Sequence, residues 1–296
     1  MRPFVILTDS TCDLRMETLQ QRQISYVTMG YTVDGTEYPA RLDWQAHTPQ
    51  QFYDYMRAGK RITTTQVSAA LFSQTFRAYL AQGQDVVYLG CSSALSGSVN
   101  TARMVAQSLR EEYPQGQIYC VDTLISSLGQ GALCLWAAAL RDAGTDAAAV
   151  AQTVQQHCLQ MNQCGTVEDL EYLRRSGRVT ASSAFFGNIF GVKPILISDR
   201  LGRNVAIKKV KGAANARAEI AAQIAQAVEQ PQQQTLFVSH ADAQAQAQAL
   251  AQQITDTVPF KDVYINTIAP IVGASVGPGT IIAFCFGKEV QLEGGN

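Results

Sequence analysis

The stretch VVYLGCSSALSG, residues 86–97, predicts the fold class because a short apolar run passes directly into a polar turn. The same pattern occurs at Phe4 to Thr8, which Asp9-Ser10-Thr11 follows, and at Ile118 to Val121. Strands that are apolar on both faces and alternate with helical segments are typical of a parallel sheet covered by helices. We therefore expect an α/β N-terminal domain with a parallel sheet and helices on both faces.

The segments between these strands carry helix and turn signals. Thr48-Pro49 supplies an N-cap and a proline at the first helical position, and Gln51 can complete a capping box. Apolar residues recur at helical spacing from Val99 to Leu109, which predicts one buried face. Asp34-Gly35 lies between alternating residues and predicts a hairpin turn.

The pattern changes after about residue 160. Asp199 to Gly202 separates two strand-like runs and predicts a second hairpin. Beyond it, Ala- and Gln-rich helices alternate with strands. We expect a smaller α+β domain over residues 161–296, after an α/β domain over residues 1–160. The expected helices are 212–229 and 242–255, and the expected strands are 194–198, 205–210, 235–239, 262–268 and 280–286.

Composition limits the functions that the chain can perform. The net charge is −1, with 23 basic and 24 acidic residues, which gives no global field for nucleic acid. The seven cysteines form no C-x-x-C pair, and their odd number argues against a disulfide framework. The longest apolar run, Ala132 to Leu140, is much shorter than the roughly 20 residues that a spanning helix needs. We expect a cytoplasmic protein.

The hydroxyl groups of the opening stretch indicate an anion site. In a doubly wound sheet, ligands bind at the carboxyl ends of the strands, where helix N-termini present free N–H groups. Ser92, Ser93 and Ser96 would hold an anion there through hydrogen bonds without a full positive charge. Ordinary N-capping, for which one serine suffices, is the alternative interpretation.

Two further segments are candidates for the same site. The polar cluster Thr63 to Ser68 precedes a helical run, and its hydroxyls exceed what one cap requires. Gly273 to Gly279 contains three glycines and a proline, which predicts a tight loop that approaches a ligand or another part of the chain closely. A plain turn between strands explains the segment Gly273 to Gly279 equally well.

Catalytic and metal-binding patterns are missing from the sequence. The three histidines, His47, His157 and His240, do not lie beside a serine in a recognised nucleophile motif. The histidines, cysteines and carboxylates show no spacing of a closed metal site. We expect no catalytic residue, no metal and no cofactor.

Together the segments resemble the DegV family along nearly the whole chain. Thr64-Thr65-Gln66-Val67-Ser68 resembles that family's T-S-Q-P-S segment, and Ser92 to Ser98 resembles its S-S-x-L-S-G-T segment. The remaining matching segments are Ile6 to Leu14, Leu170 to Val179, Lys193 to Leu196 and Gly277-Pro278-Gly279.

The resemblance implies a two-domain carrier that encloses one long-chain fatty acid, of roughly 14 to 18 carbons, at the domain junction. It implies that Thr64, Ser93 and Ser96 hold the carboxylate, with Ser92 beside them and Gly97 in the same segment. Many members deliver the acid to an ATP-dependent fatty acid kinase for phospholipid synthesis, with only transient membrane contact for lipid exchange. The carrier itself supplies no catalytic group in that scheme.

The sequence departs from the family pattern at two positions. Val67 replaces the usual proline, and Ser275 stands where the family carries a histidine in its carboxylate network. Because serine is shorter and uncharged, this change bears on the kinase-coupled role more than on the fold. A sensor or transport protein for another apolar acid is therefore an alternative function, and a hydrolase using Ser92, Ser93 or Ser96 is a third.

Two groups of residues complete the expected site. The aromatic and aliphatic residues Phe185, Phe186, Ile189 and Phe190 are candidates for the wall of the acyl pocket, with plain core packing as the alternative. Basic residues are concentrated in the second domain and are candidates for docking the kinase, with a solvated face as the alternative. The docking candidates are Arg174, Arg175, Arg178 and Arg203.

Overall fold

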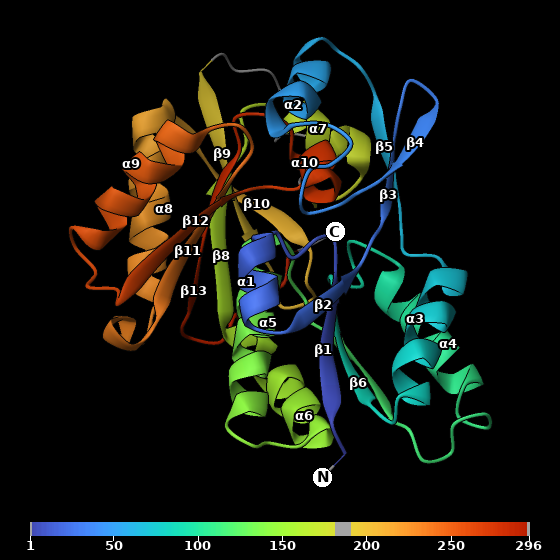
Figure 1. Cartoon of the computed structure of the whole chain (residues 1–296). Helices are drawn as coiled ribbons and strands as arrows, with labels where there is room; N and C mark the ends of the chain where they lie inside the picture. Colours follow the sequence, from blue (N-terminus) through green and yellow to red (C-terminus); the bar gives the residue numbers. More distant parts are fainter. Residues whose placement is uncertain (1, 181–190, 295–296) are drawn as a thin grey trace.

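The computed structural model describes residues 2–180 and 191–294 of the chain. Within these residues the strands form a four-stranded, a six-stranded and a three-stranded sheet (Figure 1). The four-stranded sheet uses residues from the first half of the chain, and the six-stranded sheet begins at Met161. The expected boundary near residue 160 stays a prediction.

The four-stranded sheet is parallel throughout, in the order β2-β1-β6-β7, as the sequence predicts. Every residue of β1 and β6 is buried, which explains their continuous apolar runs. The chain leaves β1 toward β2 and leaves β6 toward β7, so the strand order reverses between β1 and β6. This reversal creates a crevice at the carboxyl ends of the two strands. The strands are β1 (Phe4–Asp9), β2 (Ile24–Val27), β6 (Asp85–Gly90) and β7 (Ile118–Asp122).

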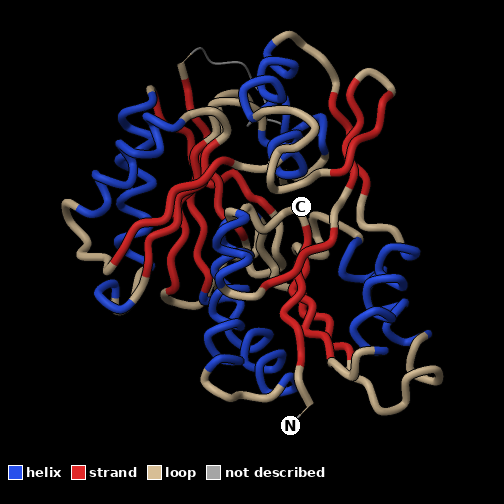
Figure 2. Tube along the Cα trace, viewed as in Figure 1, coloured by secondary structure: helices blue, strands red, loops and turns tan. Residues whose placement is uncertain are grey.

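Helix α5 (Ser127–Asp142) lies between the two larger sheets and contacts strands of both (Figure 2). Its glycines allow this close approach. A Cβ at Gly131 would lie 2.6 Å from the carbonyl oxygen of Cys12, and a Cβ at Gly129 would lie 2.8 Å from Phe284. The other helices of the first half are α1 (Met16–Gln21), α2 (Pro49–Arg57), α3 (Ala69–Ala81), α4 (Ser98–Ser108) and α6 (Ala147–His157), followed by the 3₁₀ turn η1 (Cys158–Gln160).

The six-stranded sheet is mixed, in the order β10-β9-β8-β13-β11-β12, with only the β11–β12 pair parallel. Helices α8 (Ala213–Ala227) and α9 (Gln244–Thr255) pack on it through buried alanine, leucine and isoleucine, with glutamines exposed. The predicted hairpin around Asp199 to Gly202 is confirmed. The strands are β8 (Met161–Thr166), β9 (Val192–Ser198), β10 (Asn204–Lys211), β11 (Thr235–His240), β12 (Asp262–Thr267) and β13 (Ile281–Phe286), with the 3₁₀ turn η3 (Pro231–Gln233) before β11.

The small sheet contains the predicted hairpin and a strand that the sequence pattern missed. Strands β3 (Gly30–Val33) and β4 (Thr36–Pro39) are joined by Asp34 and Gly35, both with positive φ. Strand β5 (Ile62–Thr65) adds to the other edge of β3. Its run of threonines was interpreted as a polar cluster before a helix, but threonine is β-branched and suits an edge strand.

The predicted loop Gly273 to Gly279 is wrong in its first half. Residues Pro270–Val276 form helix α10, which starts with a proline at its first turn and ends before Gly277 at φ 77°. Gly273 is needed for packing, because a Cβ there would lie 2.5 Å from the Tyr53 hydroxyl oxygen. Ser275 therefore lies on a helix, beside α7 (Leu170–Ser176).

Asp13 connects the two halves of the molecule. Its buried carboxyl accepts hydrogen bonds from the Ser127 hydroxyl at 2.6 Å and from the Ala269 backbone N–H at 2.9 Å. Asn266 donates to the Asp13 carbonyl at 2.7 Å. Burial raises the pKa of Asp13 from 3.8 to about 8, although the hydrogen bonds from Ser127 and Ala269 lower it.

This raised pKa makes stability depend on pH. Between about pH 4 and about pH 8 the folded protein holds a proton on Asp13 that the unfolded chain releases, so stability falls as pH rises through this window. We expect the stability of Asp13→Asn not to fall over this pH range, because the amide mimics the protonated carboxyl. Urea unfolding at about pH 5 and about pH 9 will then show the variant gaining stability relative to wild type at the higher pH. The exposed Glu17→Gln serves as control, and an equal pH dependence of wild type and Asp13→Asn contradicts the assignment.

Candidate ligand-binding cavity

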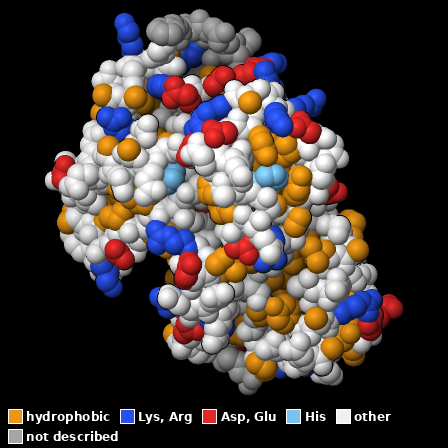
Figure 3. All heavy atoms as spheres, turned by 45° about the horizontal axis from the view of Figure 1, so that its top comes forward, with side chains coloured by type: hydrophobic (Ala, Val, Ile, Leu, Met, Phe, Trp, Pro, Cys, Tyr) orange, Lys and Arg blue, Asp and Glu red, His pale blue; other side chains and the backbone are white. Residues whose placement is uncertain are grey.

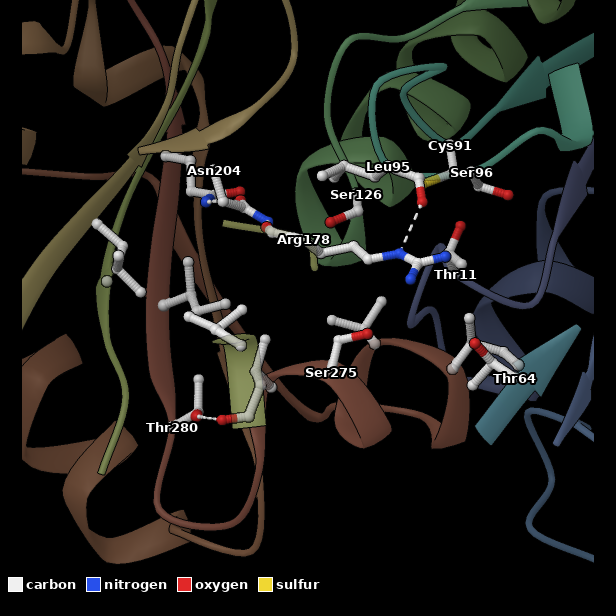
Figure 4. A pocket seen from close by; sticks show the side chains of 18 of the residues that line it. Thr11, Thr64, Cys91, Leu95, Ser96, Ser126, Arg178, Asn204, Ser275 and Thr280 are labelled. Carbon is white, nitrogen blue, oxygen red and sulfur yellow. Dashed lines mark hydrogen bonds between the residues drawn. The ribbon is translucent and has the colours of Figure 1, made fainter. Parts of the chain in front are cut away.

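A cavity of about 260 Å³ lies between the carboxyl ends of β1 and β6, helix α10 and the inner face of the six-stranded sheet (Figure 4). Both halves of the chain contribute to its wall. The second half supplies an apolar part of the lining, together with the polar residues Gln163, Thr166, Asn204 and Thr280, and both halves contribute to a polar part near the strand ends. The apolar part includes Val167, Leu173, Leu196, Ile271, Val272 and Ile282.

The polar part begins at the crevice between β1 and β6, where Thr11 and Cys91 line the cavity. The Thr11 hydroxyl is held by the carboxyl of Asp9 and lies 2.6 Å from the side-chain oxygen of Gln130. Asp9 also accepts from the Tyr88 hydroxyl at 2.7 Å. Burial and the nearby Asp9 raise the pKa of the Cys91 thiol well above its usual range, so this thiol stays protonated.

Several hydroxyl groups of the lining are available to a ligand. In the part of the chain that the structure describes, the side chains of Thr64, Ser126 and Ser275 make no hydrogen bond, although all three line the cavity. Ser96 also lines it, with its hydroxyl 3.1 Å from that of Ser98. Ser126 is not among the residues predicted from the sequence, and its only signal there is its position directly after the turn that follows β7.

Arg178 brings a positive charge to this polar part. Its side chain extends into the cavity toward Thr11 and Ser96 (Figure 4), and its Nε donates to the Leu95 carbonyl oxygen at 3.3 Å. No carboxylate among the described residues forms an ion pair with it. The sequence pattern predicts partner docking for Arg178 and no cation at the head-group end, so the position of Arg178 in the cavity is a difference from that prediction.

Thr64, Ser96, Gly97 and Ser275 of the expected set come together at the cavity, and Ser92 and Ser93 do not. The buried Ser92 hydroxyl donates instead to the Gly202 carbonyl oxygen at 2.8 Å and fixes the β9–β10 turn against the loop after β6. Ser93 is exposed. A Cβ at Gly97 would lie 2.1 Å from the side-chain oxygen of the exposed Gln66, so a larger residue there would displace the Gln66 side chain.

The remaining expected residues have other surroundings. Arg203 pairs with the buried carboxylate of Asp199 at 2.7 Å and donates to the Gly294 carbonyl oxygen, so its contacts support the hairpin. Arg174 and Arg175 are exposed on α7, where both pair with Glu171. The acyl-wall candidates Phe185, Phe186, Ile189 and Phe190 lie outside the described residues.

Comparison with known proteins identifies the family. Residues 3–288 match the model described as "Uncharacterised protein, DegV family". The chain belongs to the DegV family. It is 32% identical to a DegV domain-containing protein of Clostridium perfringens, over 98% of this chain and 100% of that protein.

Solved DegV structures share the fold. A Thermus thermophilus protein, whose structure is described as fatty acid binding of a DegV family protein, aligns with a TM-score of 0.87 at 27% identity and covers 97% of this chain and 100% of its own. A Eubacterium eligens DegV family protein loaded with heptadecanoic acid aligns with a TM-score of 0.84 at 17% identity, over 96% of this chain and 100% of its own.

The histidines of this DegV protein are occupied away from the cavity. His47 lies 2.7 Å from the Tyr31 hydroxyl, His157 lies 2.8 Å from the Thr153 carbonyl oxygen, and His240 accepts from the Ala243 backbone N–H. Among the described residues, no group of histidines, cysteines and carboxylates has the geometry to hold a metal ion.

The surface has no continuous basic field on the face shown in Figure 3, where Lys and Arg side chains are interspersed with Asp and Glu. Ion pairs among the described residues include Arg41 with Asp43 and Lys208 with Glu219. In the described ranges, no helix has both the length and the apolar character needed to span a bilayer.

The contacts of Ser92 predict a structural role for this residue. We expect Ser92→Ala to lower the free energy of unfolding by about 1–2 kcal/mol, because the Gly202 carbonyl loses a buried hydrogen bond. Ser93→Ala, at the exposed neighbouring position, is the matched control and is expected to change stability by less than about 0.5 kcal/mol. Urea denaturation measures both, and equal stabilities for the two variants contradict the prediction.

Proposed function

We propose that the protein binds one long-chain fatty acid, with the acyl tail in the apolar part of the cavity and the carboxylate at the polar part. The observation that carries this proposal is that one cavity combines a group of apolar side chains with the free hydroxyls of Thr64, Ser126 and Ser275. The Thermus relative supports it, because its structure is described as fatty acid binding.

The polar part matches the needs of a carboxylate. A carboxylate removed from water needs several hydrogen bonds, or it takes up a proton. Thr64, Ser126 and Ser275 offer hydroxyl donors, and Arg178 offers a guanidinium that favours the ionised form. We assign the head-group contacts to these four residues and to Ser96.

The tail supplies most of the affinity. About a dozen buried methylenes at ~0.8 kcal/mol each contribute on the order of 10 kcal/mol before association costs. A tail of roughly 14 to 18 carbons accounts for this burial. Phe185, Phe186, Ile189 and Phe190 remain our candidates for the further wall of the acyl pocket.

We further propose that the protein is a non-enzymatic carrier that presents the bound acid to an ATP-dependent fatty acid kinase. The support is the family resemblance of the cavity segments. Arg174 and Arg175, exposed on α7, are the residues that we assign to docking. Contact with the membrane for lipid exchange is transient in this scheme, and the setting is the cytoplasm.

A second function is a sensor or transporter of an apolar acid without kinase coupling. Ser275 favours it, because this residue lines the cavity at the position where the family carries a histidine. A serine-dependent hydrolase is disfavoured, since all three histidines make their hydrogen bonds elsewhere.

The ligand itself provides the first test. We expect organic extraction of the purified protein, followed by mass spectrometry, to return one fatty acid of roughly 14 to 18 carbons per chain. If the extract contains less than one fatty acid per chain, palmitate is added to the protein and its uptake is measured in the same way. A protein that neither carries nor takes up a fatty acid contradicts the proposal.

The head-group assignment predicts a selective loss of affinity. We expect Thr64→Val and Ser126→Ala each to weaken palmitate binding about tenfold, because each removes a hydrogen bond to a charged group. Hexadecanol, which has the same chain without the carboxylate, is the control ligand and is expected to lose much less affinity. Ser93→Ala is the control variant. Equal losses for both ligands indicate damage to the cavity and contradict the assignment.

A further inference from the structure

A buried amide lies in the part of the cavity wall that we assign to the acyl tail. Gln163, on β8, lines the cavity and is only 8% exposed. It lies two residues along the strand from Gly165, which pairs with Leu196 on β9 and with Ile282 on β13. Residues two apart on a strand face the same side of the sheet. A tail that runs along Leu196 and Ile282 therefore passes the Gln163 side chain.

Two hydrogen bonds in series fix the orientation of this amide. The Asn204 side-chain nitrogen donates to the Arg178 backbone carbonyl at 3.1 Å, so the Asn204 side-chain oxygen points the other way. That oxygen accepts from the side-chain nitrogen of Gln163 at 3.1 Å. The remaining oxygen, Gln163 Oε1, accepts no hydrogen bond from the residues that the structure describes. Since these residues contain no buried side-chain oxygen that lacks a partner, Oε1 is open to the cavity.

The threonines of the same wall differ from Gln163, because their hydroxyl protons are already used. Thr166 donates to the Pro194 carbonyl oxygen at 2.7 Å, and Thr280 donates to the Gly277 carbonyl oxygen at 2.9 Å. A buried amide oxygen without a donor costs free energy, and the methylenes of a plain acyl tail offer none. The oxygen of Gln163 is therefore satisfied only by a donor on the ligand or by a trapped water.

We propose that Gln163 Oε1 accepts a hydrogen bond from a hydroxyl group on the acyl chain, so that the cavity selects fatty acids hydroxylated at one position along the tail. This inference rests on the proposed fatty acid site. Asn204, the partner of Gln163, lies across the cavity from Thr64 in Figure 4, so the hydroxyl belongs to the tail and not to the head group. A fixed acceptor in an enclosed cavity meets one short section of a bound chain, which determines the position of the hydroxyl.

A series of hydroxypalmitates that differ only in the carbon carrying the hydroxyl tests this inference by calorimetric titration. We expect the affinity of the wild-type protein to pass through a single maximum along the series, roughly fivefold or more above the other isomers. Gln163→Met keeps the length of the side chain but removes the amide. This variant is expected to lose the maximum and to bind that isomer about tenfold more weakly, while its palmitate affinity changes less than about twofold.

Thr166→Val is the matched control, because Thr166 lines the same cavity but its hydroxyl is already bonded, and it is expected to leave the position of the maximum unchanged. The wild-type series decides the question even if Gln163→Met does not fold. A flat series, or a maximum that survives in Gln163→Met, overturns the inference, while palmitate binding leaves the fatty acid site intact.

Oxopalmitates separate a hydroxyl donor from any other oxygen on the chain. An oxo group has no proton to donate, so an oxopalmitate substituted at the same carbon is expected to gain no affinity over palmitate. An equal gain from the oxo group overturns the assignment to a hydroxyl. Wild-type protein that binds neither palmitate nor any hydroxypalmitate refutes the proposed function itself.

Discussion

The polar part of the cavity depends on the hydrogen bonds that the carboxyl group of Asp9 accepts. Fully buried at the end of β1, it accepts from the Thr11 backbone N–H at 3.0 Å, the Tyr88 hydroxyl at 2.7 Å and the Gln130 amide at 3.3 Å. Asp9 itself ends β1, Tyr88 lies on β6 and Gln130 lies on α5, so one side chain fixes the relative positions of three elements. A buried carboxyl is tolerated only when its oxygens are hydrogen-bonded, which makes this arrangement specific.

The second requirement is close contact between the halves of the chain. Small residues of α5 let this helix lie against both large sheets, and Asp13 and Ser92 add buried hydrogen bonds across the junction. The cavity therefore has a polar part to which both halves contribute and an apolar part whose side chains come mostly from the second half. An amphiphilic ligand matches that division, because each part of it meets an environment of its own polarity.

Local patterns in the sequence predicted much of the fold. The buried parallel strands, the capping box at Thr48 and both hairpins follow from short-range rules, and the structure has all of them. Long-range contacts account for the failures. Helix α10 depends on packing Gly273 against Tyr53, more than 200 residues earlier in the chain, and β5 is a strand because β3 offers it an edge.

The site was predictable to a similar degree. The hydroxyl-rich segments could be predicted because they follow strands. Their position did not show that Ser92 faces Gly202 while Ser96 faces the cavity. Nor did it reveal that Arg178 from the second half extends to the same polar part. Side-chain direction and contacts between distant segments are not encoded in spacing along the chain.

A crystal structure of the protein with bound palmitate tests the central claim most directly. The account predicts that the carboxylate oxygens lie about 3 Å from the hydroxyls of Thr64 and Ser126, with the tail running along Val167, Leu196 and Ile282. A fatty acid bound in the reverse direction, or outside this cavity, would contradict it.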